Sequence, residues 1–259
     1  MAFGCVPQQG ALLLFIVLLS SSFFVKSAVC QTIHLKVHRH DAASPKVLPN
    51  SLKLSPALIA SLSLNVPADF EKTVLQDRYT FTNRNLLAKA LLHGSYMSKE
   101  RGQTLESYEP LDQVGTMVLD YIISRPLIMN SQTNFYGNQL TTMRAALVNQ
   151  RYLTFVALKN GLDKYLFIDQ DRFKLSHIVA FREAIKDIDS YQQLVERIPD
   201  ASKRPRPGDF MHRMFKALVG AIYVDSGYDL QKTDDVIMPM FKRELDIVFN
   251  RALRKQKVL

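Results

Sequence analysis

The chain has 259 residues, which is enough for one or at most two compact domains. Hydrophobic residues make up 47% of the chain and charged residues 22%, a composition that excludes a wholly disordered or fibrous protein. Lys and Arg (33) outnumber Asp and Glu (24), and the formal net charge of +9 favours polyanionic partners such as nucleic acid or an anionic membrane.

Residues 1–30 have the pattern of a targeting segment. Positions 11–19 form an unbroken apolar run, and Ala28, Val29 and Cys30 place small residues where a signal peptidase cleaves. No Lys or Arg precedes the run, however, and the Ser-rich, acid-poor stretch after it is also typical of an organelle transit peptide. The run is shorter than the roughly 20 residues of a spanning helix. We expect the secretory pathway or endomembrane system as the location, with the mitochondrion or chloroplast as the alternative.

Residues 31–70 are expected to be a linker, because Ser, Pro and Leu are scattered through 42–68 and the composition changes near Phe70. A single domain is expected from 71 to 259. Its apolar residues recur at helical spacing nearly everywhere, and no stretch alternates as a strand does. The clearest helical patterns are at 86–91, 111–122, 140–147, 153–158, 178–188, 215–222 and 237–249. The fold class is therefore predicted to be all-α, with the charged stretch 203–208 as an exposed loop.

Three segments of this domain resemble the endonuclease domain of the ribonuclease III family. Residues 86–96 resemble its first block, in which a helix runs into a His-x-Ser-Tyr turn, here beginning at His93. Residues 109–120 resemble the signature helix, and 215–225 resemble the last block. The segments 140–149 and 160–166 fall where the family has a helix and a short turn. Order and spacing agree over about 75–230, so the resemblance implies a ribonuclease III-like helical domain.

That family cuts double-stranded RNA with magnesium, which four carboxylates hold. Two of these acids stand four residues apart on the signature helix and two stand three apart on the last helix, so each pair shares a face. Carried over to this chain, the four positions are Asp112, Thr116, Arg213 and Lys216. Two cations replace two anions, and cations repel a divalent metal ion. We therefore predict a catalytically inactive site without magnesium, in which Asp112 pairs with Arg213 or Lys216.

The alternative is an active magnesium-dependent endonuclease with a relocated site. Asp112, Asp120 and Asp225 are the acids that would form it. Otherwise Asp120 and Asp225 are expected to be solvated or capping residues. We expect His93 to make a hydrogen bond within its turn rather than to contact RNA.

Double-stranded or structured RNA is the expected partner, and a protein partner is the other candidate. The basic residues expected to contact phosphate lie in the charged loop, in the altered site and in the C-terminal tail: Lys203, Arg204, Arg206, Arg213, Lys216, Arg254 and Lys255. A solvated charge run is the alternative for the tail. Two substitutions argue against a homodimer. Gln113 stands where the family has a large apolar residue that inserts into the partner domain, and Pro110 replaces a basic residue.

The combination of a leader, one degenerate domain and only 34 residues after Asp225 resembles plant ribonuclease III-like proteins of the nuclear-fusion-defective type. That resemblance implies a role in karyogamy. We predict a non-catalytic protein related to RNA processing that binds structured RNA or a protein partner. The alternatives are the active endonuclease and a non-catalytic subunit of an organelle ribosome.

Overall fold

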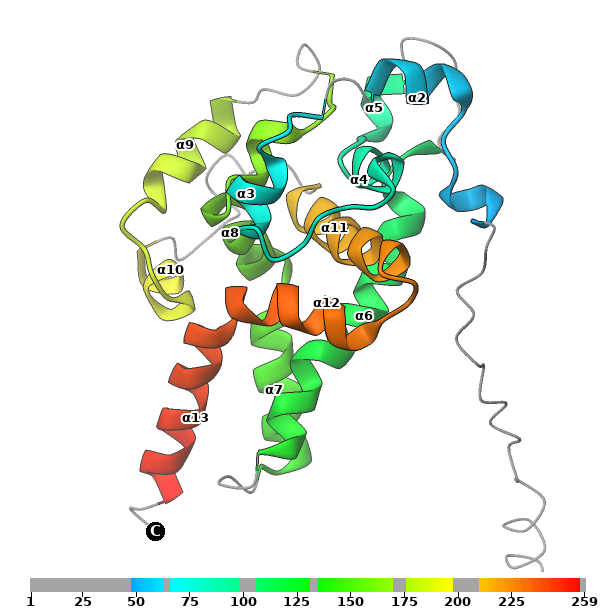
Figure 1. Ribbon diagram of the computed structural model, residues 1–259. Coiled ribbons are helices and arrows are strands. Elements are labelled where there is room, and N and C mark those ends of the chain that lie inside the picture. The colour runs from blue at the N-terminus through cyan, green and yellow to red at the C-terminus, as the bar shows by residue number, and fades with distance from the viewer. Residues whose placement is uncertain are drawn as a thin grey trace, which may run out of the picture. The chain divides into compact units, whose positions relative to one another are not determined.

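The computed structural model describes residues 48–62, 66–97, 106–130, 135–169, 176–197 and 210–256, although the side chains of 61–62, 97 and 252–256 are not described (Figure 1). The predicted leader, 1–30, lies outside this range. Among the described residues, no helix combines the length and apolar character needed to cross a membrane. The compact unit that holds all of the described residues comprises 44–259.

The described residues are mostly helical, and the all-α prediction is confirmed. Extended pairing in this part of the chain is limited to one isolated parallel bridge, between Leu92 and Phe167. In chain order the helices are η1 (Asn50–Leu52), α2 (Pro56–Leu62), α3 (Phe70–Leu75), α4 (Arg84–Ala90), α5 (Gly94–Met97), α6 (Glu109–Met129), α7 (Gly137–Val148), α8 (Gln150–Lys159), η3 (Leu162–Tyr165), α9 (Ser176–Ala184), α10 (Tyr191–Arg197), α11 (Met211–Asp225), α12 (Leu230–Ile237), η4 (Met238–Met240) and α13 (Lys242–Gln256).

Side chains at the N-termini explain where several of these helices begin. The side-chain oxygen of Asn83 accepts a hydrogen bond from an amide in the first turn of α4, and Asn149 does the same for α8. Asp229 accepts from the amide of Lys232 at 3.0 Å and caps α12. Because the first amides of a helix have no partner within it, these caps stabilise each helix by about 1 kcal/mol.

The centre of the fold is the pair α6 and α11, against which α4, α7, α8 and α12 also pack. The two helices meet through Gly115 and Gly220. A Cβ atom on Gly115 would overlap the backbone carbonyl of Lys216, and one on Gly220 would overlap that of Leu111. Only glycine allows the two backbones to approach this closely. This contact sets the register of α6 on α11 and so positions the side chains one turn away, which include Asp112.

Part of the segment expected to be a linker, 31–70, packs into the core. Leu52, Leu54 and Leu58 are each 7% exposed, and η1 and α2 lie against α6 and α4 (Figure 1). The carboxylate of Glu106 accepts a hydrogen bond from the amide of Ser55 at 2.9 Å. Sequence reasoning weighed the Ser and Pro content of this segment, whereas the domain buries its leucines.

The same segment lies over a buried cation. Lys89 on α4 is fully buried, and its Nζ donates a hydrogen bond to the carbonyl oxygen of Lys53 at 3.4 Å. Burial lowers the pKa of Lys89 to about 8, although the charge of Glu106 acts in the opposite direction. This lysine therefore contributes to stability in a way that depends on pH.

Candidate functional site

The positions that the resemblance assigns to metal-binding acids lie where α6 passes α11. Here Arg213 Nε donates a hydrogen bond to Asp112 Oδ2 at 2.9 Å. The Asp112 side chain is only 5% exposed, whereas that of Arg213 is 35% exposed. A second guanidinium nitrogen of Arg213 lies 3.6 Å from Glu109 Oε1. The predicted ion pair of Asp112 is thus present, and Arg213 is its partner.

The guanidinium of Arg213 lies over a pair of stacked rings, Tyr108 and His93. The Arg213 guanidinium carbon lies 5.2 Å from the ring centroid of Tyr108, which stacks on the His93 ring at 5.8 Å. Burial raises the pKa of Tyr108 to about 12, partly offset by the charge of Arg213. Burial lowers the pKa of Arg213, but the hydrogen bond and charge of Asp112, with the charges of its other neighbours, raise it overall above its ordinary value. Arg213 is therefore a permanent cation.

His93 fills the structural role that its turn predicts. Its Nδ1 lies 2.8 Å from Ser95 Oγ, and the backbone amide of Ser95 donates to the same nitrogen at 3.1 Å. The ring also contacts Phe210, at 5.0 Å between centroids. These contacts hold the turn after α4 against the start of α11.

The side chains at this site do not suit magnesium. The Thr116 hydroxyl donates to the backbone carbonyl of Asp112 at 2.8 Å, so it bonds to its own helix. Lys216 is half-buried on α11, one turn beyond Arg213. Magnesium requires several oxygen ligands, and the two carboxylates here, Asp112 and Glu109, both lie against the Arg213 guanidinium. Across the described ranges, no group of three or more His, Cys, Asp or Glu side chains is placed to hold a metal ion.

The three acids of the alternative metal site have three separate sets of partners. Asp120 forms an ion pair with Arg144 at 3.0 Å, with both side chains about 40% exposed. Asp225 accepts hydrogen bonds from Tyr79 Oη at 2.8 Å and from the amides of Thr82 and Asn83 at 2.8 and 2.7 Å. Asp225 thus joins the end of α11 to the turn before α4, as a capping residue does. The structure does not bring Asp112, Asp120 and Asp225 together.

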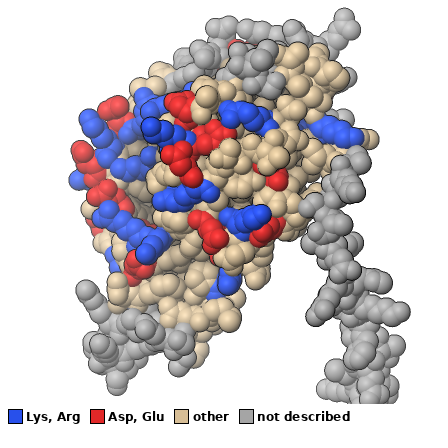
Figure 2. Space-filling view, in the orientation of Figure 1, with Lys and Arg blue, Asp and Glu red and all other residues tan. Residues whose placement is uncertain are grey.

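Of the basic residues expected to contact RNA, only Arg213 and Lys216 have described side chains. Lys203, Arg204 and Arg206 lie outside the described residues. Arg254 and Lys255 belong to α13, but their side chains are not described. On the face in Figure 2, Lys and Arg alternate with Asp and Glu rather than forming a continuous basic band. Gln113 is exposed on α6 and Pro110 is half-buried in its first turn, and the argument against a homodimer stays a prediction.

Two residues at the site escaped sequence reasoning. Tyr108 carries the Arg213 guanidinium on its ring, and Glu109 supplies a second negative charge to it. Glu109 stands three residues before Asp112, so their positions on one face of a helix were a usable signal. The contact between Tyr108 and Arg213 had no such signal, because the two residues are distant in the sequence.

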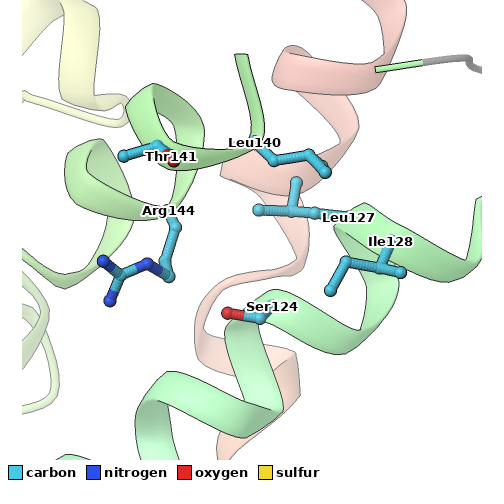
Figure 3. A pocket seen from close by; sticks show the side chains of 6 residues that line it. All are labelled: Ser124, Leu127, Ile128, Leu140, Thr141 and Arg144. Carbon is cyan, nitrogen blue, oxygen red and sulfur yellow. The ribbon is translucent and has the colours of Figure 1, made fainter. Parts of the chain in front are cut away.

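A small hollow lies between α6 and α7 (Figure 3). Its volume is about 180 Å³, and its lining combines apolar side chains with two hydroxyls and one guanidinium: Ser124, Leu127, Ile128, Leu140, Thr141 and Arg144. Asp120 balances the charge of Arg144. Nothing in the sequence pattern pointed to this hollow.

Comparison with known proteins finds similarity to one family over part of the chain. Residues 83–182 match the model of a family described as ribonuclease-III-like. Endoribonuclease Dicer of Gallus gallus is 28% identical over 179 residues, which are 67% of this chain and 9% of that protein. Ribonuclease 3 of Desulfotalea psychrophila is 30% identical over 162 residues, 62% of this chain and 54% of the relative. The chain thus spans about a tenth of Dicer and about half of the bacterial enzyme.

Among solved structures, the nuclease domain of ribonuclease III from Campylobacter jejuni aligns with 67% of this chain and 97% of its own length, at 19% identity and a TM-score of 0.47. The family match and the curated relatives confirm the resemblance read from the sequence blocks. Residues 83–182 are thus similar to the ribonuclease-III-like family.

Proposed function

We propose that this ribonuclease III-like chain binds structured RNA and does not cleave it. One observation carries the proposal. The Arg213 guanidinium is bound to the only acid among the four inferred metal positions, at 2.9 Å from Asp112, and a buried tyrosine ring supports it. A magnesium ion at this place would have to displace a permanent cation from its carboxylate.

The electrostatic cost of such a displacement is large. Two unit charges 4 Å apart interact by about 4 kcal/mol in surroundings typical of a protein surface, which is the scale of breaking the Arg213–Asp112 pair. The repulsion between a divalent ion and a nearby unit cation such as Arg213 or Lys216 is roughly twice as large at the same distance. The hydroxyl of Thr116 supplies no compensating charge. The proposed consequence is a domain that keeps the family fold without its metal chemistry.

The same cations favour phosphate. Arg213 is one-third exposed and Lys216 is half-buried, so both can approach an RNA backbone from α11. The net charge of +9 strengthens this attraction at long range. Binding of this kind releases counterions and weakens steeply as salt increases. The role in karyogamy that the plant resemblance implies stays a prediction.

The test uses the full chain, double-stranded RNA and magnesium. A mobility-shift assay should show binding that weakens with salt, and a denaturing gel should show intact RNA. Lys216→Gln should weaken binding a few-fold, because it removes one phosphate contact. Lys232→Gln is the matched control, since the Lys232 side chain is 64% exposed and α12 carries none of the four inferred positions. Shortened RNA products that require magnesium would refute the proposal.

A second experiment tests the assignment of the four positions. The triple variant Thr116→Asp, Arg213→Asp, Lys216→Glu restores an acid at each altered place beside Asp112. Titration calorimetry should then detect magnesium binding that the original chain lacks. Circular dichroism must confirm that the variant is folded. A folded variant with unchanged magnesium affinity would show that these residues do not share one site.

A further inference from the structure

A long uncharged stretch forms the end of the α6 and α7 pair. Residues 126–143 contain no Asp, Glu, Lys or Arg, although charged residues make up 22% of the chain. The stretch includes the last turn of α6 and the first turns of α7. Because α6 and α7 pack side by side, its described parts lie at one end of this helix pair (Figure 1).

Large apolar side chains are exposed at this end. Ile128 is 63% exposed and Met129 is 75% exposed at the end of α6, and Tyr136 is 77% exposed just before α7. We call Ile128, Met129, Phe135 and Tyr136 the α6–α7 tip. Scattered exposed apolar residues are normal, but three large ones within one uncharged stretch indicate a surface that another molecule or a membrane covers.

A basic helix lies next to the tip. The ring of Phe135 stacks on that of Phe249 in α13, with 6.2 Å between centroids. After Asp246 the sequence contains no acid, and it contains four basic residues: Arg251, Arg254, Lys255 and Lys257. Figure 1 shows the end of α6, the start of α7 and the end of α13 on the same side of the domain. Apolar tip residues and a basic helix end are thus neighbours.

We propose that the α6–α7 tip docks onto the surface of an anionic lipid bilayer. The apolar side chains enter the interfacial layer, where tyrosine is favoured, and the basic end of α13 contacts lipid phosphates. RNA is a poorer fit for this surface, because the 126–143 stretch offers no cation to phosphate. This proposal assigns the basic end of α13 to lipid, whereas the RNA contacts argued under the proposed function are Arg213 and Lys216 on α11, so the two can be tested separately.

The absence of tryptophan from the chain makes a local test possible. Tyr136→Trp in the full chain places a single tryptophan at the tip, and its fluorescence reports the tip rather than the apolar leader. Adding vesicles of phosphatidylcholine and phosphatidylserine should shift its emission to shorter wavelength. Vesicles of phosphatidylcholine alone should give a smaller shift, as should high salt.

Charge at the tip provides the matched comparison. In the Tyr136→Trp background, Met129→Asp should weaken vesicle binding by about tenfold, because it places a carboxylate where the apolar layer begins. Val179→Asp is the control, since Val179 is 45% exposed on α9. Circular dichroism should confirm that both variants are folded.

Three results would overturn the proposal. The first is tryptophan emission from the Tyr136→Trp variant that mixed vesicles leave unchanged. The second is an equal loss from Met129→Asp and Val179→Asp. The third is emission that ignores vesicles yet shifts as protein concentration rises, which would make the tip a contact between copies of the chain.

Discussion

Replacing Arg213 with alanine should destabilise the domain by leaving Asp112 buried without its counter-ion. The Asp112 side chain is 5% exposed, and its Oδ1 has no hydrogen-bond partner in the described part of the chain. Removing one member of a buried ion pair typically costs about 3–5 kcal/mol. Because the Arg213 side chain is 35% exposed, water can enter after truncation, and we expect about 2–3 kcal/mol.

Thermal and urea unfolding of the full chain measure this loss. A domain of this size loses about 2–4 °C in Tm per kcal/mol, so Arg213→Ala should lower Tm by about 4–12 °C. The control is Arg144→Ala, which breaks an ion pair of similar length, 3.0 Å, whose two side chains are both about 40% exposed. Exposed pairs contribute less than about 1 kcal/mol, so this variant should remain close to the original chain.

A double-mutant cycle isolates the pair itself. Combining Asp112→Asn with Arg213→Ala removes both charges, and the double variant should be more stable than the sum of the two single losses predicts. Additive losses would refute the reasoning that Arg213 neutralises Asp112. Equal stability of Arg213→Ala and the original chain would refute it as well.

Other positions give equally direct tests. The pKa of Lys89 falls from 10.5 to about 8 on burial, so between pH 8 and 10.5 the unfolded state binds more protons than the folded state. The free energy of unfolding should therefore rise with pH across this interval by about 3 kcal/mol relative to the Lys89→Met variant, as measured by urea titrations. Gly115→Ala should cost more than about 3 kcal/mol, because its Cβ would overlap the Lys216 carbonyl, whereas Gly137→Ala, with nothing within 4 Å, should be nearly neutral; thermal melts compare them. Asp225→Ala should cost about 2–4 kcal/mol because three donors lose their acceptor, and urea unfolding that shows less than about 0.5 kcal/mol would contradict this.

The amino-acid sequence determined the helices and the chemistry of the altered site. Helical spacing of apolar residues depends on neighbours three and four positions apart, so it is readable without tertiary information. The blocks around His93, Asp112 and Phe215 indicated the family to which the comparisons find the chain similar. The residue types at the four inferred positions, Asp112, Thr116, Arg213 and Lys216, are likewise read from the sequence itself.

Only the tertiary structure decided which of these groups meet. Sequence reasoning left Asp112 with two candidate partners, and the approach of α6 to α11 selects Arg213, 101 residues away. The burial of Leu52, Leu54 and Leu58 beside α4 also required the structure, because a short leucine-containing segment has no helical stripe long enough to separate it from a linker. Pairings of this kind depend on how close two backbones come. Here that distance follows from a glycine contact between helices about 100 residues apart, which local spacing along the chain does not encode.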